Sequence, residues 1–252
     1  EPSAAKSDVK SVYQDIWLGA FPSLTAGPVT DRDLFYSSYL QTYLQRDVRD
    51  LAQVGDELAF VRFLRACAAR TAQMLNLAEL ARDADVAPNT AKSWLSILQA
   101  SFQVYLLQPY FSNVTKRLVK RPKLYFLDTG LAAYLTEWSS PETLAAGAMA
   151  GAMFETHVLA ELLKSWWHRG KTPGLYYYRD RDGGEIDFLF RQDQVFHPVE
   201  VKKTASPRRE LAGPFKALAS LEGTVGQGAI VCLCQQWTPL TQDVDAVPAR
   251  II

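Results

Sequence analysis

Apolar residues recur every three or four positions in the first part of the chain, and this spacing predicts helices. One helix is expected from Asp31 to Leu51 and a second from Glu57 to Ala72. The apolar positions of the first helix include Leu34, Tyr39, Tyr43, Leu44 and Val48. The buried stripe of the second helix would consist of Leu58, Val61, Leu64 and Ala68. We expect residues 1–55 to form a helical N-terminal segment.

Two shorter helices joined by a tight turn are expected next. Asn76 and Glu79 form a capping-box pattern, which predicts that a helix begins there and covers 77–84. A longer helix over 88–100 begins with a proline, which the first helical position tolerates because its backbone N–H needs no partner within the helix. Two helices separated by so short a turn predict a helix-turn-helix.

Two predicted strands, Val104–Leu107 and Leu124–Leu127, flank a loop that is rich in Lys and Arg. With the helix-turn-helix they predict a winged-helix domain over 56–147, whose second helix enters the DNA major groove while the loop contacts phosphates. From that helix we expect DNA contacts by Asn89, Thr90, Lys92 and Ser93. From the loop we expect contacts by Lys116, Arg117, Lys120, Arg121 and Lys123. The alternative is a packing module with solvated basic residues, and in both cases Trp94 is expected in the core.

The C-terminal part alternates between helical and strand patterns. The predicted elements are a helix over 149–167, a strand over 175–179, a hairpin over 185–190 and 195–202, a helix over 208–221, a strand over 229–234 and a short terminal strand. This order predicts a mixed sheet flanked by helices over residues 148–252. The whole chain is therefore expected to be an α/β (α+β) protein, and Cys232 and Cys234 are expected to be buried thiols.

Three polar residues of the predicted hairpin stand at the spacing of a catalytic centre. Strand alternation places Glu200 and Lys202 on one face, and a two-residue turn at 193–194 would set Asp187 directly opposite Glu200. Two facing carboxylates repel each other, and a divalent cation with oxygen ligands, Mg²⁺ or Mn²⁺, would relieve that repulsion. Lys202 would then orient an attacking water or stabilise developing charge. A register slip of one residue would move Asp187 to the opposite face.

Glu155 is expected to support this centre. It shares a helical face with Val158, Leu159 and Leu162, so its carboxylate would point toward the sheet and need a partner such as the metal. The carbonyl of Val201 is a further expected metal ligand. The expected catalytic residues are Asp187, Glu200, Lys202 and Glu155. Two other interpretations stay open, a solvated cross-strand pair and a nuclease fold that has lost its activity.

The segments Glu185–Asp187 and Val199–Lys202 resemble the core of the PD-(D/E)XK nuclease superfamily. More narrowly, the chain resembles the C-terminal portion of bacterial and archaeal AAA-type P-loop ATPases that carry a DUF4143 domain. The stretches that carry this resemblance, besides the hairpin, are Tyr39–Asp47, Leu98–Leu107, Lys120–Leu131 and Gly151–Glu155. The resemblance implies an ATPase domain upstream, then a winged helix, then a nuclease-like domain. The sequence has no Gly-x-x-x-x-Gly-Lys-Ser/Thr loop, so ATP is expected to act only through that upstream domain, which this chain would follow.

Charge and hydropathy restrict the classes of partner. The 252 residues include 27 basic and 27 acidic side chains, so any affinity for nucleic acid must come from local basic patches. No apolar run is long enough to cross a bilayer and no secretory signal is present, which predicts a cytoplasmic protein without a membrane partner. The expected partners are DNA rather than RNA and the ATPase domain of the same parent polypeptide, and an oligomer is left open. The expected function is that of a DNA-associated module with metal-dependent phosphodiester hydrolysis, or of an inactive adaptor that couples an ATPase to DNA or to a protein.

Overall fold

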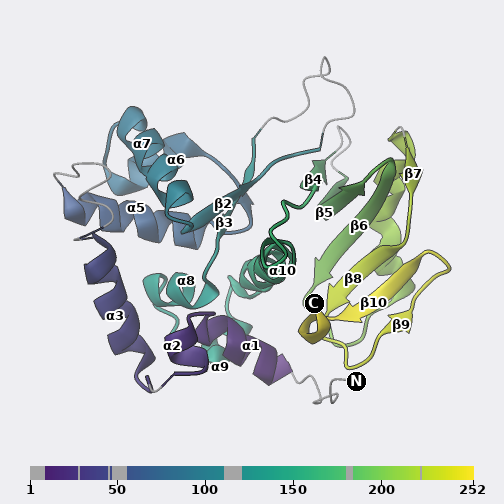
Figure 1. Cartoon of the computed structure of the whole chain (residues 1–252), viewed down its shortest axis with the longest axis horizontal. Coiled ribbons are helices and arrows are strands. Elements are labelled where there is room, and N and C mark those ends of the chain that lie inside the picture. Colours follow the sequence, from purple (N-terminus) through teal and green to yellow (C-terminus); the bar gives the residue numbers. More distant parts are fainter. Residues whose placement is uncertain are drawn as a thin grey trace. The chain divides into compact units, whose positions relative to one another are not determined.

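The structure, a computed structural model, describes residues 9–27, 29–44, 46, 56–110, 121–179, 184–221 and 223–252. These residues form two compact units whose segments alternate along the chain, and Figure 1 gives the labels of their elements. The helical unit comprises the described residues of Tyr13–Leu106 and Leu124–Thr156. The sheet unit comprises the described residues of Glu1–Val12, Leu107–Lys123 and His157–Ile252. The predicted domain boundaries after residues 55 and 147 stay a prediction.

Helices supply most of the structure before the C-terminal sheet. In chain order they are α1 (Val9–Leu18), α2 (Pro22–Thr25), α3 (Arg32–Tyr43), α5 (Glu57–Ala69), α6 (Leu77–Ala84), α7 (Pro88–Ala100), α8 (Thr129–Leu135), α9 (Pro141–Ala146) and α10 (Ala150–Trp167). A three-stranded sheet with the order β1–β3–β2 accompanies them. Its strands are β1 (Gln73–Met74), β2 (Val104–Leu107) and β3 (Lys123–Phe126).

Local signals set the bounds of α6 and α7, and both predicted helices are confirmed. The Asn76 side chain accepts a hydrogen bond from the backbone N–H of Glu79 at 3.4 Å, which caps the start of α6. The helix ends at Asp85, whose backbone φ of 57° lies in the left-handed region. Pro88 occupies the first turn of α7, as its position in the sequence predicted.

The buried stripe predicted for α5 is partly wrong. Leu58 is 74% exposed, whereas Phe60 and Phe63 are fully buried. The two rings bury more apolar area than a leucine in the first turn can, so α5 presents them to the core. Trp94 of α7 packs edge-on against both rings, with centroids 5.2 and 5.7 Å away, and its prediction as a core residue is confirmed.

The extents predicted for the first two helices also differ from the structure. The described helix α3 ends at Tyr43, and residues 45 and 47–51 of its predicted extent lie outside the described residues. Leu34 of α3 is 64% exposed, so it does not belong to a buried stripe. α5 ends three residues early, because Ala72 has a backbone φ of 61° that cannot continue a right-handed helix.

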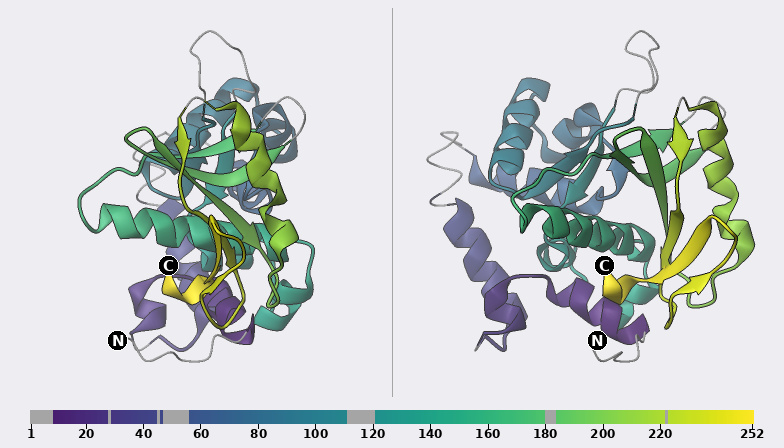
Figure 2. Two further views of the ribbon diagram at one scale, coloured as in Figure 1. Left: turned by 90° about the vertical axis from the view of Figure 1, so that its right-hand side faces the viewer. Right: turned by 45° about the vertical axis from the view of Figure 1, so that its right-hand side comes forward.

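One mixed sheet forms the centre of the sheet unit, and Figure 2 presents its strands from two further directions. The order is β4–β5–β6–β8–β10–β9, with β7 beside β6. The strands are β4 (Leu175–Arg179), β5 (Glu185–Gln192), β6 (Val195–Lys202), β7 (Thr224–Val225), β8 (Gly228–Cys232), β9 (Thr238–Pro239) and β10 (Val244–Pro248). β5 is antiparallel to β4 and β6, whereas β8 is parallel to β6 and β10. The predicted α/β class with a mixed sheet is confirmed.

The turn between β5 and β6 fixes the register on which the predicted centre depends. Gln192 pairs with Val195 and Phe188 pairs with Val199, so the hairpin has the two-residue turn that was predicted. Asp193 adopts a backbone φ of 56°, which lies in the left-handed region used by tight hairpin turns.

Apolar side chains from η2 (Arg209–Ser220) cover part of the sheet. Phe215 packs both on a cluster that contains Ile186 and Phe196 and on a second cluster that contains Ile230. The α-helix predicted over 208–221 is a 3-10 helix instead, because Pro214 inside it has no backbone N–H to donate. Another 3-10 helix, η3 (Ala249–Ile251), follows β10.

Other predicted features of the sheet unit are confirmed. Trp166 of α10 stacks on Phe190 of β5, with ring centroids 6.3 Å apart, so this helix flanks the sheet. Cys232 and Cys234 are buried, as predicted, and burial raises the pKa of the Cys232 thiol to about 12. None of the helices in the described ranges combines the length and the apolar character that a membrane span requires.

Candidate functional site

Asp187 lies at the end of the β5–β6 ladder, next to the Phe188–Val199 pair. Its Oδ2 accepts a hydrogen bond from the backbone N–H of Val201 at 2.9 Å, so the carboxylate takes a position that a strand carbonyl would otherwise fill. The residue is 8% exposed. Asp187 is therefore fixed by β6 itself, on the predicted side of the hairpin, beside Glu200.

Glu200 is the least satisfied carboxylate of the site. It is 4% exposed, and its Oε1 accepts a hydrogen bond from Lys202 Nζ at 2.5 Å. Its Oε2 is buried and accepts no hydrogen bond from any described residue. Burial, and then the nearby charge of Asp187, raise the pKa of Glu200 to about 7, while the hydrogen bond from Lys202 opposes the shift.

Lys202 connects this buried pair with solvent. Its side chain is 37% exposed, although Nζ contacts Glu200. Strand alternation predicted that Glu200 and Lys202 share a face, and their hydrogen bond confirms it. Lys202 thus places a half-exposed ammonium group beside the buried carboxylate of Glu200.

A second lysine enters the site from outside the hairpin. Lys123 is 4% exposed, and its Nζ lies 2.6 Å from Glu185 Oε1 and 3.7 Å from Asp187 Oδ1. The Tyr177 ring lies beneath it, with the centroid 5.7 Å from Nζ. Lys123 was expected in a DNA-contacting loop, and the structure corrects this, since a buried, paired ammonium group cannot reach a phosphate backbone. The signal for burial was the apolar run Leu124–Leu127 that directly follows it.

The charges of this cluster balance without a metal ion. Glu185 also pairs with Arg179, whose Nη1 lies 3.5 Å from Glu185 Oε2. Three carboxylates, those of Glu185, Asp187 and Glu200, thus face the cations of Lys123, Arg179 and Lys202. Although the charges balance in number, Glu200 Oε2 has no hydrogen-bond partner among the described residues.

The metal role predicted for Glu155 stays a prediction. Glu155 belongs to the helical unit, where Tyr125 donates a hydrogen bond from its hydroxyl to Glu155 Oε1 at 2.6 Å. In the described part of the chain no group of three or more His, Cys, Asp or Glu side chains could hold a metal ion. An ion at Asp187 and Glu200 would need further oxygen ligands from a backbone carbonyl, such as that of Val201, from water or from a phosphate.

Comparison with known proteins divides the chain into two matched parts. Residues 9–142 match the family described as Domain of unknown function (DUF8612), and residues 150–252 match Domain of unknown function (DUF4143). The chain belongs to the DUF8612 family. It carries a DUF4143 domain after the DUF8612 region, as the resemblance implied.

Two mycobacterial proteins resemble the chain over almost its whole length. They are Uncharacterized protein Rv2008c of Mycobacterium tuberculosis and Uncharacterized protein Mb2031c of Mycobacterium bovis. Each is 34% identical over 248 residues, which cover 96% of this chain and 54% of the relative. The chain thus spans about half the length of these curated relatives.

The candidate site combines residues from both matched regions. Asp187, Glu200 and Lys202 come from the DUF4143 domain, whereas Lys123 comes from the DUF8612 region. All four lie in the sheet unit. The DUF8612 region therefore supplies a buried cation to the DUF4143 carboxylates.

The residues predicted to contact DNA are spread over several parts of the DUF8612 region. Asn89, Lys92 and Ser93 are exposed on α7, and Thr90 is half-buried beside them. Arg121 is exposed, and its carbonyl accepts a hydrogen bond from the Tyr177 hydroxyl at 2.5 Å. The predicted contacts that lie outside the described residues are Lys116, Arg117 and Lys120.

Proposed function

We propose that the DUF4143 domain hydrolyses phosphodiester bonds in DNA with a divalent cation at Asp187 and Glu200. The observation that carries the proposal is the buried Glu200 Oε2, which accepts no hydrogen bond from any described residue. Burial, and then the nearby charge of Asp187, raise the pKa of Glu200 to about 7. A buried carboxylate oxygen without a donor is costly, and a hard cation is the partner that would relieve both the desolvation and the repulsion.

The residues present fit such an ion. Asp187 and Glu200 would hold it through carboxylate oxygens, and the Val201 carbonyl is a candidate for a third ligand. Bound Mg²⁺ or Mn²⁺ would supply the positive charge that stabilises a phosphodiester under attack. Lys202, half-exposed and anchored on Glu200, would donate a hydrogen bond to the attacking water or to the phosphate.

The order of elements in the DUF8612 region supports a winged helix that brings DNA to the domain. α5, β1, α6 and α7 are followed by β2 and β3, and these three strands form one small sheet. In this arrangement α7 would be the recognition helix, and its exposed Asn89, Lys92 and Ser93 stand near its start.

The second candidate is an inactive adaptor that couples a partner to DNA. The observation that favours it is Lys123, which already neutralises Glu185 and Asp187 from a buried position. A site whose carboxylates are paired with lysines needs no metal for its stability. We propose an ATPase domain of the parent polypeptide as one such partner, because the chain resembles the C-terminal portion of P-loop ATPases that carry a DUF4143 domain.

Metal-dependent cleavage of plasmid and linear DNA tests the first candidate. With Mn²⁺ the parent should nick or cut DNA, and Asp187→Asn should be at least about 100-fold slower, because it removes a ligand charge that acts on the transition state. Asn can still accept the hydrogen bond from Val201, so the fold is preserved. Asp193→Asn is the matched control, since it removes a carboxylate at the exposed turn of the same hairpin and leaves a residue that tolerates its positive φ.

Two results would reject the enzyme and favour the adaptor. One is the absence of cleavage by the parent with either metal, and the other is equal rates for the parent and Asp187→Asn. The adaptor predicts DNA binding that survives Glu200→Gln and is lost when Lys120 and Arg121 are both replaced by Gln. Calorimetric titration with Mn²⁺ in the absence of DNA separates the two candidates further, because an adaptor should bind no ion at Asp187.

A further inference from the structure

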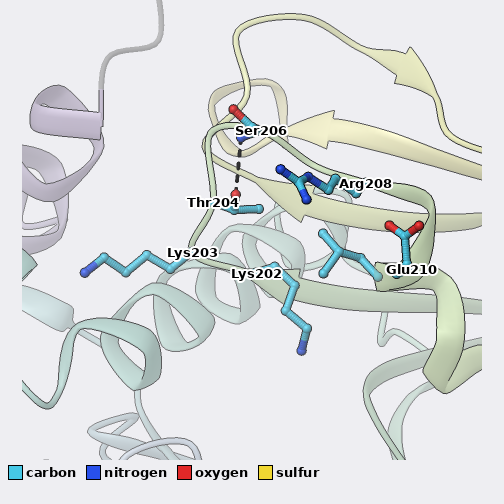
Figure 3. A pocket seen from close by; sticks show the side chains of 7 residues that line it. Lys202, Lys203, Thr204, Ser206, Arg208 and Glu210 are labelled. Atoms are coloured by element: carbon cyan, nitrogen blue, oxygen red, sulfur yellow. Dashed lines mark hydrogen bonds between the residues drawn. The ribbon is translucent and has the colours of Figure 1, made fainter.

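A pocket opens where β6 ends. Its volume is 610 Å³, and it is shown in Figure 3. The residues that line it are Lys202, Lys203, Thr204, Ser206, Arg208, Glu210 and Leu211. Lys202 therefore belongs both to this pocket and to the carboxylate site, because its Nζ contacts Glu200 Oε1. The other lining residues play no part in the proposed metal site.

The backbone of the pocket wall is held in place by hydrogen bonds. Leu233, just after β8, donates its backbone N–H to the carbonyl of Thr204 at 2.9 Å. Thr204 Oγ1 accepts a hydrogen bond from the backbone N–H of Ser206 at 3.2 Å, which Figure 3 marks. The backbone N–H of Leu211 donates to the carbonyl of Arg208 at 3.1 Å. The segment between β6 and η2, which forms most of the pocket wall, is thus held by hydrogen bonds to β8's end and within itself.

The charge of the lining favours an anion of low charge. Lys202, Lys203 and Arg208 are cationic, and Glu210 is anionic. If the charge of Glu200 cancels that of Lys202, and the charge of Glu210 cancels that of Lys203, the positive charge of Arg208 is still not neutralised. A guanidinium group close to serine and threonine hydroxyls is a donor set that suits phosphate oxygens. One surplus positive charge matches the single negative charge of a phosphodiester.

We propose that this pocket binds a backbone phosphate of a nucleic-acid strand, next to the phosphate that reaches Asp187 and Glu200. Arg208 makes the main contact, and the Thr204 and Ser206 side chains line the same cavity. The placement of the neighbouring phosphate at Asp187 and Glu200 rests on the proposed function. Binding of a strand phosphate in the pocket is independent of that function, because it needs no metal. Lys202 links the two positions, so the pocket would set which phosphodiester bond lies at the carboxylates.

Binding of a labelled short duplex in EDTA, followed by fluorescence anisotropy over a range of salt concentrations, tests the pocket. Arg208→Gln should weaken binding about 5- to 10-fold at low salt and lower the slope of log Kd against log salt by about 1, as expected for one lost phosphate contact. Arg209→Gln is the matched control, because Arg209 is the exposed neighbour of Arg208 and does not line the pocket. Its affinity should change less than about 2-fold. Circular dichroism should be the same for all three proteins.

Two arms distinguish the sources of the phosphate. Arg208→Gln should weaken binding equally for a duplex with a 5′-phosphate and for one with a 5′-hydroxyl, because the pocket binds an internal phosphate. A loss confined to the 5′-phosphate duplex would overturn the proposal in favour of an end-binding pocket. Equal losses for Arg208→Gln and Arg209→Gln, or no measurable binding by the parent at low salt, would also overturn it. Since no metal is present, a failed cleavage assay leaves this test untouched, and Asp187→Asn should bind as the parent does.

Discussion

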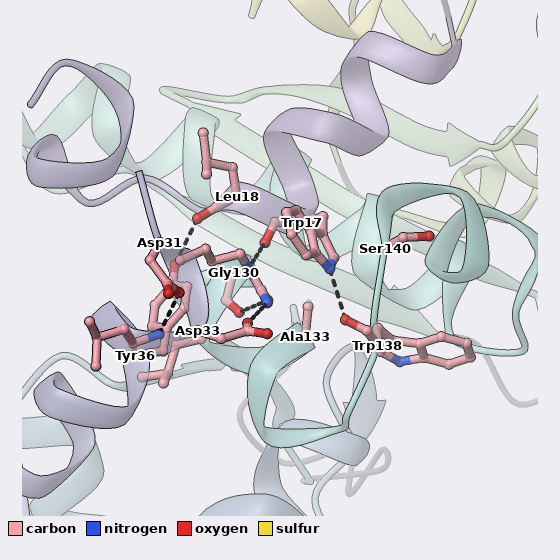
Figure 4. Close-up of polar contacts among 12 residues, drawn as sticks. Trp17, Leu18, Asp31, Asp33, Tyr36, Gly130, Ala133, Trp138 and Ser140 are labelled. Atoms are coloured by element: carbon pink, nitrogen blue, oxygen red, sulfur yellow. Dashed lines mark hydrogen bonds and ion pairs between the residues drawn. The ribbon is translucent and has the colours of Figure 1, made fainter. Parts of the chain in front are cut away.

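The two units each bury charged side chains, but they satisfy them in different ways. In the helical unit, Arg32 and Asp128 belong to a network in which each polar group of the two side chains has a protein partner. Figure 4 shows part of this network around Trp17, Tyr36 and Gly130. In the sheet unit, Glu200 has an oxygen that none of the described residues satisfies.

The Arg32 network is a structural anchor. Its guanidinium group donates to the carbonyls of Trp17 and Gly130 at 2.8 and 2.9 Å and to Asp33 at 2.6 Å, and it stacks over the Trp17 ring at 4.0 Å. Burial lowers the pKa of Arg32, and the nearby charge of Asp33 opposes this. Together these contacts give each nitrogen of the guanidinium group an acceptor within the protein.

Asp128 completes the anchor. Its Oδ1 accepts from the backbone N–H of Leu131 at 2.7 Å and from the Tyr36 hydroxyl at 2.9 Å, and its Oδ2 accepts from the backbone N–H of Ala20 at 2.8 Å. The contrast with Glu200 supports the metal site that we propose. A buried polar group with a full set of partners stabilises the fold, whereas one that lacks a partner marks a place where an ion or a substrate can bind.

The largest loss of stability is expected at Gly130, because neighbouring atoms of the Arg32 network leave no space there for a side chain. In Gly130→Ala the new Cβ would lie 2.5 Å from the carbonyl oxygen of Leu18 and 2.6 Å from Gly19 Cα, and it would also overlap the Tyr36 hydroxyl. These contacts involve backbone that cannot rotate away, so we expect a loss of more than about 3 kcal/mol in the free energy of unfolding, measured with urea.

Gly151→Ala provides the control for this prediction. Gly151 lies in α10, and a Cβ built there meets nothing within 4 Å. Alanine has the higher helix propensity, so this variant should be as stable as the parent or about 1 kcal/mol more stable. Similar losses for the two glycine variants would show that the Arg32 network is not sterically locked.

The second prediction concerns the buried cation of the sheet unit. Lys123→Met should lower the free energy of unfolding by about 3 kcal/mol in EDTA, because it leaves Asp187 and Glu185 without that partner. Mn²⁺ should then raise the thermal unfolding temperature of Lys123→Met more than that of the parent, because the freed carboxylates attract the ion. The measurement is calorimetric unfolding with and without Mn²⁺.

Lys164→Met is the matched control, since Lys164 pairs with Glu161 on a partly exposed helix surface. Its unfolding free energy should change by less than about 1 kcal/mol, with no added response to Mn²⁺. If Mn²⁺ stabilised the parent and Lys123→Met equally, Lys123 and the metal would not share the carboxylates.

The third prediction applies one substitution to both regions. Asp128→Asn should cost about 2 kcal/mol, because the amide NH₂ would face the backbone N–H of Ala20 and could not accept its hydrogen bond. Asp187→Asn should cost less than about 1 kcal/mol, because the amide oxygen keeps the bond from Val201 and the repulsion with Glu200 disappears. That relief offsets the loss of the ion pair with Lys123, which keeps its closer partner Glu185. Urea unfolding of both variants at neutral pH measures the difference. Equal costs would mean that the two carboxylates have the same structural role.

The sequence predicted those parts of the fold that depend on neighbouring residues. The bounds of α6, α7, β4 and β6 followed from a capping residue, a proline and strand alternation, all of which act within a few positions. The register of the β5–β6 hairpin, which places Asp187 next to the Phe188–Val199 pair, followed from the length of one turn. These features could be predicted because little of the rest of the chain affects them.

Features that depend on distant contacts were not predicted. Lys123 stands beside a basic stretch and was assigned to solvent, but Glu185, far along the chain, holds it in the interior. Leu58 was expected to be buried, although the adjacent Phe60 takes that place against Trp94. Each of these two residue types occurs both in the interior and at the surface, and contacts with residues far along the chain determine which environment it takes.

The smallest predicted effect on stability is its dependence on pH through the titration of Glu200. It tests whether Glu200, unlike the residues of the Arg32 network, is a buried group with an oxygen that no described residue satisfies. Its pKa rises from an ordinary 4.5 to about 7 in the folded protein, so the folded state binds the proton more tightly than the unfolded state does. The stability that this group contributes is fully present below about pH 4.5 and is lost as the pH rises through about 7.

The free energy of unfolding of Glu200→Gln should therefore equal that of the parent near pH 4.5 and exceed it by about 1 kcal/mol near pH 8. The loss of the Lys202 ion pair reduces this gain. Thermal unfolding across this range measures the gain, and saturating Mn²⁺ should abolish it by stabilising the parent alone. A constant difference between the two proteins at every pH would mean that Glu200 is ionised throughout and that its second oxygen has a partner.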